Sequence, residues 1–359
     1  MGGPSDLQIA QPLTLKCGLT LPNRLVKAAM AEQMAGPNQL PDERMLTLYK
    51  HWAQGGWGLI ITGHVHIDDA HLGAPADPAL SPSLPSDTLI TAYSALARAS
   101  QTTNPQSASP PKRNQPGHTP TIIQLNHPGR QSPRGAGTRS LLTPALAPSA
   151  VPLSLGPGLL ARALRVLAFG TPKAMSVAEI EGVVGQFARA ARREGEVGEW
   201  VEQVRAVVEE GVDFVEVSGG SYEDPKMIWG NDGPDGAQEE KSDRTKAREA
   251  FFLEFARLIR KEFPDVPLMV TGGFSSRGGM ERAVVDGDCD LIGLARPAVL
   301  NPLLPNNLVL NSEVKDQDAR VYRRKHKTPW FAKFLGLPVI GAGMDSQFYV
   351  NKIHEMAKA

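Results

Sequence analysis

The sequence is poor in cysteine and has no excess of charge of either sign, and each shortage excludes a class of protein. Two cysteines, Cys17 and Cys289, in 359 residues cannot build a disulfide framework or a zinc ligand set. Lysine plus arginine and aspartate plus glutamate number 38 each, so the net charge is zero and gives no reason to expect nucleic acid as a partner. We therefore expect a reducing compartment, and an anionic ligand would have to be held by local contacts.

Long apolar runs are missing as well. No run of 18 apolar residues occurs, so no membrane span is predicted. The first six residues, MGGPSD, lack the basic and apolar regions of a secretory signal, and Asp6 stands where a myristoylation signal needs serine or threonine. These absences predict a cytoplasmic protein that has no membrane partner.

The sequence does contain short apolar runs that alternate with helical stretches. Six runs with little polar alternation read as strands of a parallel sheet that is covered on both faces: 24–30, 59–62, 121–126, 212–217, 268–271 and 290–294. Helices are predicted at 42–54, 86–100, 245–263 and 279–286, and a capping box at 176–179 opens another. The alternation predicts an α/β fold, either a closed β/α barrel or a doubly wound open sheet, and periodicity does not separate the two.

Three segments depart from this alternation. Residues 176–211 read as helix after helix, so about six of the eight strands of a TIM-type barrel are recognisable. Residues 102–120 are rich in proline, serine, asparagine and glutamine without periodicity, and we interpret them as a flexible surface insertion. Residues 336–359 form a C-terminal tail with a short helix, which we expect to contribute packing.

A phosphate site is predicted after the last two strands. Gly272 and Gly273 follow one strand and precede a helix, so backbone N–H groups can approach an anion at a helix N-terminus. Ala295 and Arg296 end the next strand, and the guanidinium of Arg296 can meet the same phosphate. Barrels often bind phosphate with the loops after these two strands.

Polar side chains in and after two other strands are candidates for ligand contacts. Gln124 lies in an apolar strand and is either a satisfied core amide or a group aimed at the edge of a heterocycle. His127 follows that strand, and His64, His66 and His71 follow the preceding one. A His-x-His pair can bind metal, but no third ligand is placed, so no metal site is predicted. The absence of a nucleophile elbow argues against Ser/His/Asp hydrolysis.

Several of these segments, taken together, resemble the old yellow enzyme family of NADH:flavin oxidoreductases. The matching stretches occur in family order: PNRLVKAAMAE (22–32), GLIITGHVHID (58–68), IIQLNHPGRQSP (122–133), APSAVPL (147–153), VDFVEVSGGSYEDPKM (212–227), PLMVTGGFSSRGGM (267–280) and DLIGLARP (290–297). The set is specific, although any one stretch alone would be weak.

The resemblance implies that residues 1–359 form one FMN-binding β/α-barrel domain. The positions that match the family's cofactor-binding residues are Ala28, Ala29, Met30, Ala31, His64, Gln124, Gly272, Gly273, Ala295 and Arg296. The implied reaction is reduction of FMN by NADPH or NADH, followed by hydride transfer to an enone or similar acceptor. In the family a pair of donors, usually His/His or His/Asn, polarises the substrate carbonyl, and a tyrosine often supplies the proton.

One part of the family pattern has no counterpart. The strand with the histidine motif and the following strand are missing near residues 195–198, and Ala31 replaces a threonine or cysteine that often tunes the flavin. Three explanations are open: an exon lost from the sequence, a natural loss of activity, or takeover by other residues. His127, Tyr222 and His64 are the nearby substitutes, with His127 and Tyr222 as the catalytic candidates.

The resulting hypothesis is an FMN-dependent NAD(P)H oxidoreductase of the ene-reductase type, with a catalytically impaired flavin-binding scaffold as the alternative. A different phosphate-binding barrel, such as an isomerase, would leave Gln124 and KAAM (27–30) unexplained. Reduced stability and weak FMN retention are predicted, because two missing strands would expose unpaired sheet edges. A homo-oligomer is left open.

Overall fold

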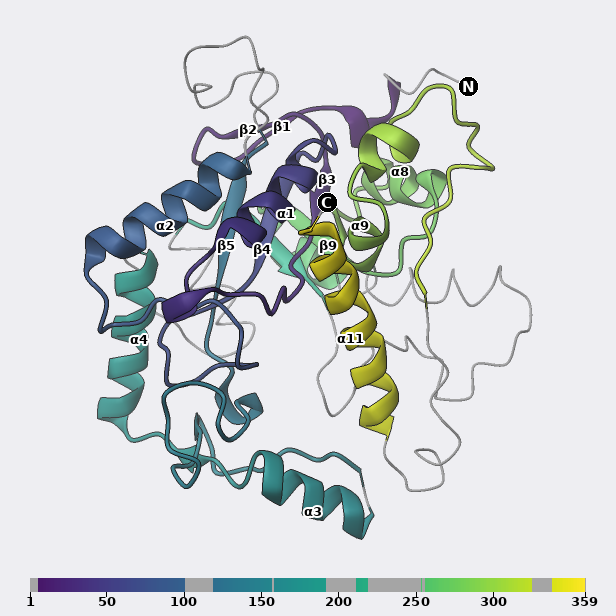
Figure 1. Cartoon of the computed structure of the whole chain (residues 1–359). Helices are drawn as coiled ribbons and strands as arrows, with labels where there is room; N and C mark the ends of the chain where they lie inside the picture. Colours follow the sequence, from purple (N-terminus) through teal and green to yellow (C-terminus); the bar gives the residue numbers. More distant parts are fainter. Residues whose placement is uncertain are drawn as a thin grey trace.

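A parallel sheet of six strands occupies the centre of the computed structural model (Figure 1), which describes residues 6–100, 119–156, 158–191, 211–218, 253, 256–324 and 338–358. Its strands are β3 (Leu25–Lys27), β4 (Leu59–His66), β5 (Thr121–Asn126), β8 (Val215–Val217), β9 (Leu268–Thr271) and β10 (Leu291–Leu294). They are ordered β5-β4-β3-β10-β9-β8, and each neighbouring pair is parallel. The sheet curls as part of a TIM-type barrel, so the predicted incomplete barrel is confirmed.

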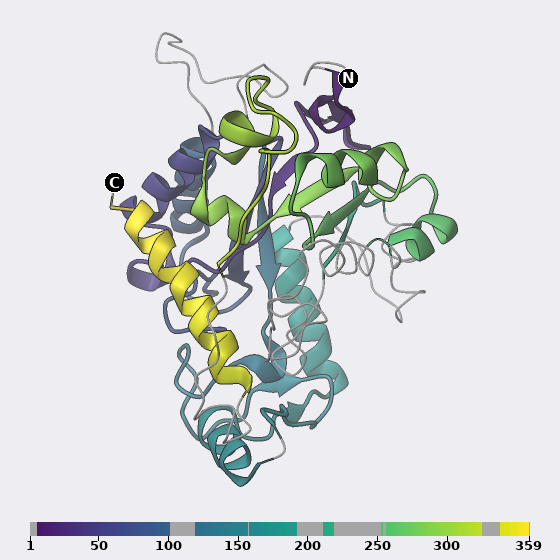
Figure 2. The same cartoon turned by 90° about the vertical axis from the view of Figure 1, so that its right-hand side faces the viewer.

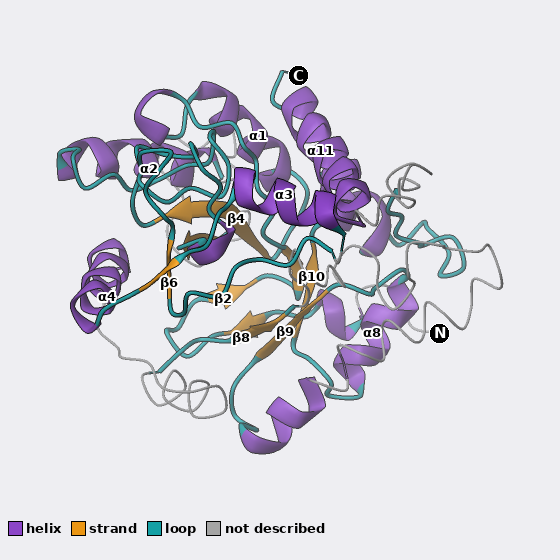
Figure 3. Ribbon diagram, turned by 90° about the horizontal axis from the view of Figure 1, so that it is seen from below, coloured by secondary structure: helices purple, strands orange, loops and turns teal. Residues whose placement is uncertain are grey.

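Most of the described helices cover the outer side of this sheet. They are α1 (Glu43–Ala53), α2 (Ser86–Ala99), α4 (Val177–Ala191), α8 (Arg277–Val285), α9 (Arg296–Leu300) and α11 (Pro338–Met356). Helix α3 (Leu159–Ala168) lies apart from the sheet, in a small apolar cluster of its own (Figure 1). Seen from below, α1, α2 and α11 lie on one side of the strands and α8 lies on another (Figure 3). None of the described helices combines the length and the apolar character that crossing a membrane requires.

Short elements complete the described chain. An antiparallel pair, β1 (Leu13–Thr14) and β2 (Thr20–Leu21), precedes the sheet, and a parallel pair, β6 (Leu146–Ala147) and β7 (Lys173–Ala174), flanks α3. The remaining turns are η2 (Gln8–Ala10), η3 (Pro37–Gln39), η4 (Gly129–Gln131) and the π-helical η5 (Pro305–Val309).

The two faces of the sheet carry two separate apolar clusters. Toward the helices, Leu25, Ile60 and Ile292 pack against α1 and its neighbours. Toward the barrel interior, Val26, Ile61, Met269 and Leu291 pack against β1 and β2, with Ile122 at the margin. Because successive side chains of a strand alternate between faces, residue 124 shares the interior face with Ile122, and residue 271 shares it with Met269.

The sequence of helix α1 determines where the helix begins and which of its faces is buried. Asp42 is the N-cap, and its carboxylate accepts the backbone N–H groups of Arg44 at 3.1 Å and Met45 at 3.2 Å. Met45, Leu48, Tyr49 and Trp52 are buried at helical spacing and attach the helix to the sheet. The predicted helix at 42–54 is thereby confirmed to within a residue at each end.

The predicted capping box at the start of α4 is also confirmed. The Ser176 hydroxyl accepts the Glu179 N–H at 3.3 Å, and a Glu179 carboxylate oxygen accepts the Ser176 N–H at 2.9 Å. Two backbone N–H groups at the start of the helix, which have no partner within the helix, are therefore hydrogen-bonded to side chains.

Some expectations differ from the structure. The strand expected at 59–62 extends to His66, because β5 pairs with it beyond a register shift between Ile61 and His64. Helix α3 and the strand pair β6 and β7 lie in a stretch, 129–174, for which no element was predicted, and the C-terminal tail contains a helix of 19 residues. Residues 102–118 of the predicted insertion, and 219–252 with Tyr222, lie outside the described residues.

Candidate functional site

The groups predicted to hold a phosphate lie side by side at the carboxyl edge of the sheet. Strands β9 and β10 are parallel neighbours in which Gly293 is opposite Thr271. Gly272 and Gly273 therefore leave β9 at the level where Ala295 and Arg296 leave β10. Ligands of α/β proteins bind outside the carboxyl ends of strands, which is the edge that these four residues share.

The backbone at the two glycines requires glycine. Gly272 has φ +108° and Gly273 has φ +85°, a region that residues with a Cβ rarely adopt. Helix α8 follows, and its N-cap Ser276 accepts the Gly279 N–H at 3.2 Å. The loop thus places backbone without Cβ atoms just before the start of a helix. This arrangement binds anions through backbone N–H groups.

The basic side chain of this edge is placed by the C-terminal helix. Arg296 is 14% exposed, and its Nη1 lies 4.0 Å from Oδ2 of Asp345, a buried residue of α11. The guanidinium carbon lies 6.0 Å from the centre of the Tyr349 ring, one turn further along α11. Figure 2 shows α11 (yellow) running beside α1 along the outer side of the sheet. The tail therefore shapes the site, and sequence reasoning that treated it as packing missed this role.

The interior face carries buried polar atoms that lack partners within the described part of the chain. These are Oε1 of Gln124 and Nδ1 of His64. His64 and Gln124 are register partners on β4 and β5, and the Gln124 N–H donates to Thr62 Oγ1 at 3.0 Å. Leaving such an atom unsatisfied costs about 1–3 kcal/mol, so a polar ligand edge at this face would be stabilising.

His64 is uncharged in this setting. Burial lowers the pKa of His64, and the smaller effect of nearby Asp77 opposes that shift. A neutral imidazole and a primary amide together offer donors and acceptors to a heterocycle without adding charge. The residues present therefore fit the edge of a heterocyclic ring such as that of a flavin.

The segment 28–31 follows β3 and passes between these two groups of residues. The Ala28 N–H donates to the Leu294 carbonyl at 3.1 Å, which ties the segment to β10. On its other side, a Cβ at Gly63 would lie 2.3 Å from the Met30 carbonyl oxygen and 2.0 Å from a Glu32 carboxylate oxygen. The close approach of β4 to residues 30–32 therefore depends on glycine at position 63.

A buried polar cluster supports this segment from behind. The Glu32 carboxylate accepts the Tyr49 hydroxyl and the Gly63 N–H, the latter at 2.8 Å. Lys27 is fully buried, donates to the Ile61 carbonyl at 2.9 Å, and lies 4.1 Å from the centre of the Trp52 ring. Desolvation by burial lowers the pKa of Lys27 to about 8, although nearby Glu32 opposes the shift.

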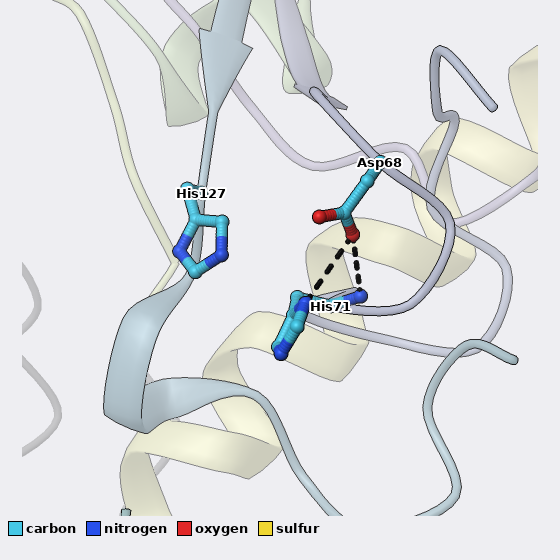
Figure 4. A group of neighbouring side chains, drawn as sticks. All are labelled: Asp68, His71 and His127. Carbon is cyan, nitrogen blue, oxygen red and sulfur yellow. Dashed lines mark hydrogen bonds and ion pairs between the residues drawn. The ribbon is translucent and has the colours of Figure 1, made fainter. Parts of the chain in front are cut away.

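The histidines after β4 have different environments. His66 is fully buried and has partners at both ring nitrogens: Nε2 accepts the Gly73 N–H at 3.0 Å and lies 3.0 Å from Asp77, and Nδ1 lies 3.4 Å from the Asn126 amide. His71 and His127 instead lie together beside Asp68 (Figure 4), with ring centres 5.0 Å apart. The pattern His64-x-His66 thus does not form a ligand pair, and the cluster that the fold does assemble joins residues 68–71 to residue 127.

One titratable group of the interior face escaped the sequence reasoning. Glu216 on β8 is opposite Met269 in the register and therefore faces the interior beside Thr271. Burial raises the pKa of Glu216, and a hydrogen bond with Thr271 opposes the rise. An acidic residue inside the run VDFVEV was the available signal.

No protein-family model matches the chain, but individual proteins do. The NADH-dependent flavin oxidoreductase iccE of Talaromyces variabilis is 37% identical over 429 aligned positions that cover 99% of each chain. The NADH-dependent flavin oxidoreductase iliE of Neonectria sp. (strain DH2) is 38% identical over 431 positions, covering 98% of this chain and 54% of that relative. Among solved structures, morphinone reductase superposes with a TM-score of 0.52 at 18% identity, covering 84% of this chain and 89% of that one.

The alignments also concern the two barrel strands that have no counterpart in this sequence. The alignment with the Talaromyces variabilis protein spans 429 positions, whereas this chain has 359 residues, so at least 70 positions have no residue here. A β/α barrel uses about 30 residues per βα unit, so the shortfall corresponds to about two units. In the described part of the chain, β5 and β8 are the two ends of the sheet.

Proposed function

Because this chain belongs to the old yellow enzyme family of flavin-dependent oxidoreductases, we propose that it binds FMN and uses it to transfer hydride from NADH to an α,β-unsaturated carbonyl or a similar acceptor. The choice of NADH over NADPH follows the names of the fungal relatives. The ene-reductase chemistry follows from the resemblance of the cofactor-binding segments.

The observation that carries the proposal is the position of the two phosphate-binding groups. Gly272 and Gly273 follow β9, Arg296 follows β10, and the two strands are parallel neighbours that end at one edge. Neither a glycine turn nor an arginine alone is specific. Together at the last two strands of a barrel, they form a local anion site in a chain without net charge.

The residues of the chain would share the binding as follows. Backbone N–H groups at 272–273 and the Arg296 guanidinium would hold the phosphate. The Gln124 amide and the His64 ring would meet the polar edge of the isoalloxazine, which satisfies their buried atoms. Segment 28–31 would pack against the ring, held in place by β10 on one side and by Gly63 on the other.

When bound, FMN supplies the hydride-transfer chemistry, and the chain supplies orientation and polarisation. His127 lies three residues after Gln124, immediately after the carboxyl end of β5. Burial lowers the pKa of His127 to about 4, so the ring is neutral near pH 7. Its Nδ1 accepts the Gly129 N–H at 3.2 Å, which leaves Nε2–H as the group able to donate to a substrate carbonyl.

Enone-dependent oxidation of NADH tests the proposal. Purified protein supplemented with FMN should oxidise NADH faster with 2-cyclohexenone than without it, and faster than free FMN does. His127→Ala should reduce that rate about 10²-fold, as loss of an oxyanion-hole donor does. His51→Ala is the control, because His51 lies on α1. No turnover above free FMN would contradict the proposed activity.

A second function is favoured by one observation, the at least 70 alignment positions without a residue in this chain. If the donors that the family places there have no replacement, the chain is a flavin-binding scaffold without turnover. The same assay separates the two, because the scaffold would bind FMN yet add nothing to the rate that free FMN gives. Measuring bound flavin alongside turnover therefore distinguishes loss of catalysis from loss of binding.

A further inference from the structure

We propose that Asp68, His71 and His127 form a binding site for a divalent transition metal, with Zn²⁺ as the ion that suits them best. One ligand atom from each residue falls within 4.8 Å of those of the other two. Two imidazoles and one carboxylate are a ligand set that Zn²⁺ accepts, and three protein ligands leave a fourth position for water or a substrate oxygen.

The separations are close to those of a coordination sphere. Asp68 Oδ1 and His71 Nδ1 are 3.4 Å apart. Bonds of 2.0–2.1 Å in a tetrahedron place ligand atoms about 3.4 Å from one another. The widest separation, up to 4.8 Å, would have to shrink by about 1.4 Å to reach that spacing. The residues concerned lie after strand ends, where side-chain rotation can supply that movement.

The second observation is that Nε2 of each histidine is buried without a partner among the described residues. His71 is 8% exposed, and its Nδ1 meets the Asp68 carboxylate as an ion pair at 3.4 Å (Figure 4). By contrast, both ring nitrogens of the neighbouring His66 have polar partners, since Nε2 lies beside Asp77 and Gly73 and Nδ1 lies 3.4 Å from the Asn126 amide. Buried imidazole nitrogens without partners beside a carboxylate indicate a missing ligand.

The Asp68 carboxylate has room for a cation. Its Oδ1 accepts the N–H groups of Ala70 at 3.0 Å and His71 at 2.8 Å, and the carboxylate retains acceptor capacity after both.

Two features oppose binding, and neither is large. A metal on Nε2 of His127 requires the proton on Nδ1, which removes the hydrogen bond from the Gly129 N–H. One neutral hydrogen bond is small beside the affinity of a three-ligand zinc site. Arg139 is the nearby cation, and its guanidinium is held by oxygen atoms of Ala70, Ser132 and Pro133.

The sequence did not indicate this site because its third ligand comes from another strand. His71 and Asp68 follow β4, whereas His127 follows β5, and only the parallel pairing of those strands brings them together. Zinc binding is measured without substrate, so its test does not depend on turnover, although the site shares His127 with the proposed oxidoreductase activity. If the site holds zinc, His127 acts as a metal ligand and not as a direct donor to the substrate.

Calorimetric titration of Zn²⁺ into the full chain, after removal of metal by a chelator and dialysis, tests the proposal. We expect one Zn²⁺ per chain with a dissociation constant of about 1 µM or lower. His71→Ala and His127→Ala should each weaken binding about 100-fold, and His51→Ala should leave it unchanged. The proposal is overturned if the wild type binds no stoichiometric zinc, or if both cluster variants bind as the wild type does.

Cobalt spectroscopy of the unsubstituted protein gives a result that does not depend on the folding of variants. Co²⁺ held by two imidazoles and a carboxylate should show visible d–d bands that Zn²⁺ abolishes in a 1:1 ratio. A strong near-ultraviolet thiolate band would place the ion on a cysteine, such as the exposed Cys17, and would overturn the assignment. Absence of any d–d band would do the same.

Discussion

At the scale of single residues, the proposed flavin site separates into residues that contact the phosphate and residues that contact the ring. Arg296 belongs to the first, and Gln124 belongs to the second. This division can be tested with riboflavin, which has the same ring as FMN and lacks the phosphate. Variants of the two residues should therefore affect the two flavins differently.

Gln124→Leu should weaken FMN and riboflavin by the same factor, about 10-fold. The change removes one buried hydrogen-bonding group toward the ring edge, which corresponds to about 1–2 kcal/mol. Quenching of flavin fluorescence measures both dissociation constants. Gln131→Leu, the same substitution in η4 outside the sheet, is the control. A loss confined to FMN would place Gln124 at the phosphate and contradict its assignment.

Asp345→Asn should tighten FMN binding about 3- to 10-fold. Asp345 brings a buried negative charge to 4.0 Å from the Arg296 guanidinium, and that charge repels a phosphate placed beside the arginine. The amide keeps the shape and an acceptor oxygen, so Arg296 should stay in place. Titration with FMN and with riboflavin measures the effect, which should be confined to FMN. Weaker FMN binding would show that the charge is needed to position Arg296.

Lys27 predicts a specific dependence of stability on pH. Its pKa is about 8 when folded, against 10.5 when unfolded, so between these values the unfolded chain binds the extra proton. The free energy of unfolding should therefore rise by about 2 kcal/mol from pH 8 to pH 10 in the wild type relative to Lys27→Met. Urea denaturation at each pH measures this.

The control for Lys27 is Lys50→Met on the exposed face of α1, which should preserve the rise. The measurement stops at pH 10 because burial raises the pKa of Tyr49, so its ionisation would oppose folding at higher pH. A pH profile of Lys27→Met parallel to that of the wild type would mean that Lys27 is not desolvated.

At the scale of elements, α1 connects the chain's stability to the site, because it supplies Tyr49 to Glu32 and Trp52 to Lys27. Asp42→Ala should lower the free energy of unfolding by about 1 kcal/mol, since two backbone N–H groups lose their acceptor. Asp42→Asn should lose little, because asparagine caps as well as aspartate does. Equal losses in both variants, seen by urea denaturation, would show that charge matters here and capping does not.

Elements with strong local signals were predictable from the sequence. Strand β5 and strand β9 match their predicted bounds, because each is an apolar run with clear stops on either side. The α4 start was predictable from the Ser176–Glu179 capping box alone. Helix α3 was not, since proline and glycine on both sides of it read as a connection.

The candidate site was predictable only in part, for a related reason. Gly272, Gly273 and Arg296 lie in sequence next to strand ends, so the barrel order alone brings them together. Asp345 and the Asp68, His71 and His127 cluster depend on contacts between segments far apart in the chain. No local pattern reports such contacts, and the sequence therefore did not indicate them.

At the scale of the whole molecule, the described part of the barrel retains the cofactor edge and ends at β5 and β8. The six strands include the first three and the last two that carry the proposed flavin contacts. Sequence reasoning placed the missing units near residues 195–198, and this position lies in the chain between β5 and β8, the two ends of the sheet. Whether this protein binds the cofactor and whether its substrate-binding side is complete are therefore two separate questions.

The most direct test of the account is the ratio of the dissociation constants for riboflavin and FMN, measured on the wild type and on Arg296→Ala. If the edge after β9 and β10 holds the phosphate, the wild type should bind FMN about 100-fold more tightly than riboflavin, and the variant should reduce that ratio to about 10-fold or less. Equal affinity for the two flavins in the wild type, or a ratio that Arg296→Ala leaves unchanged, would contradict it.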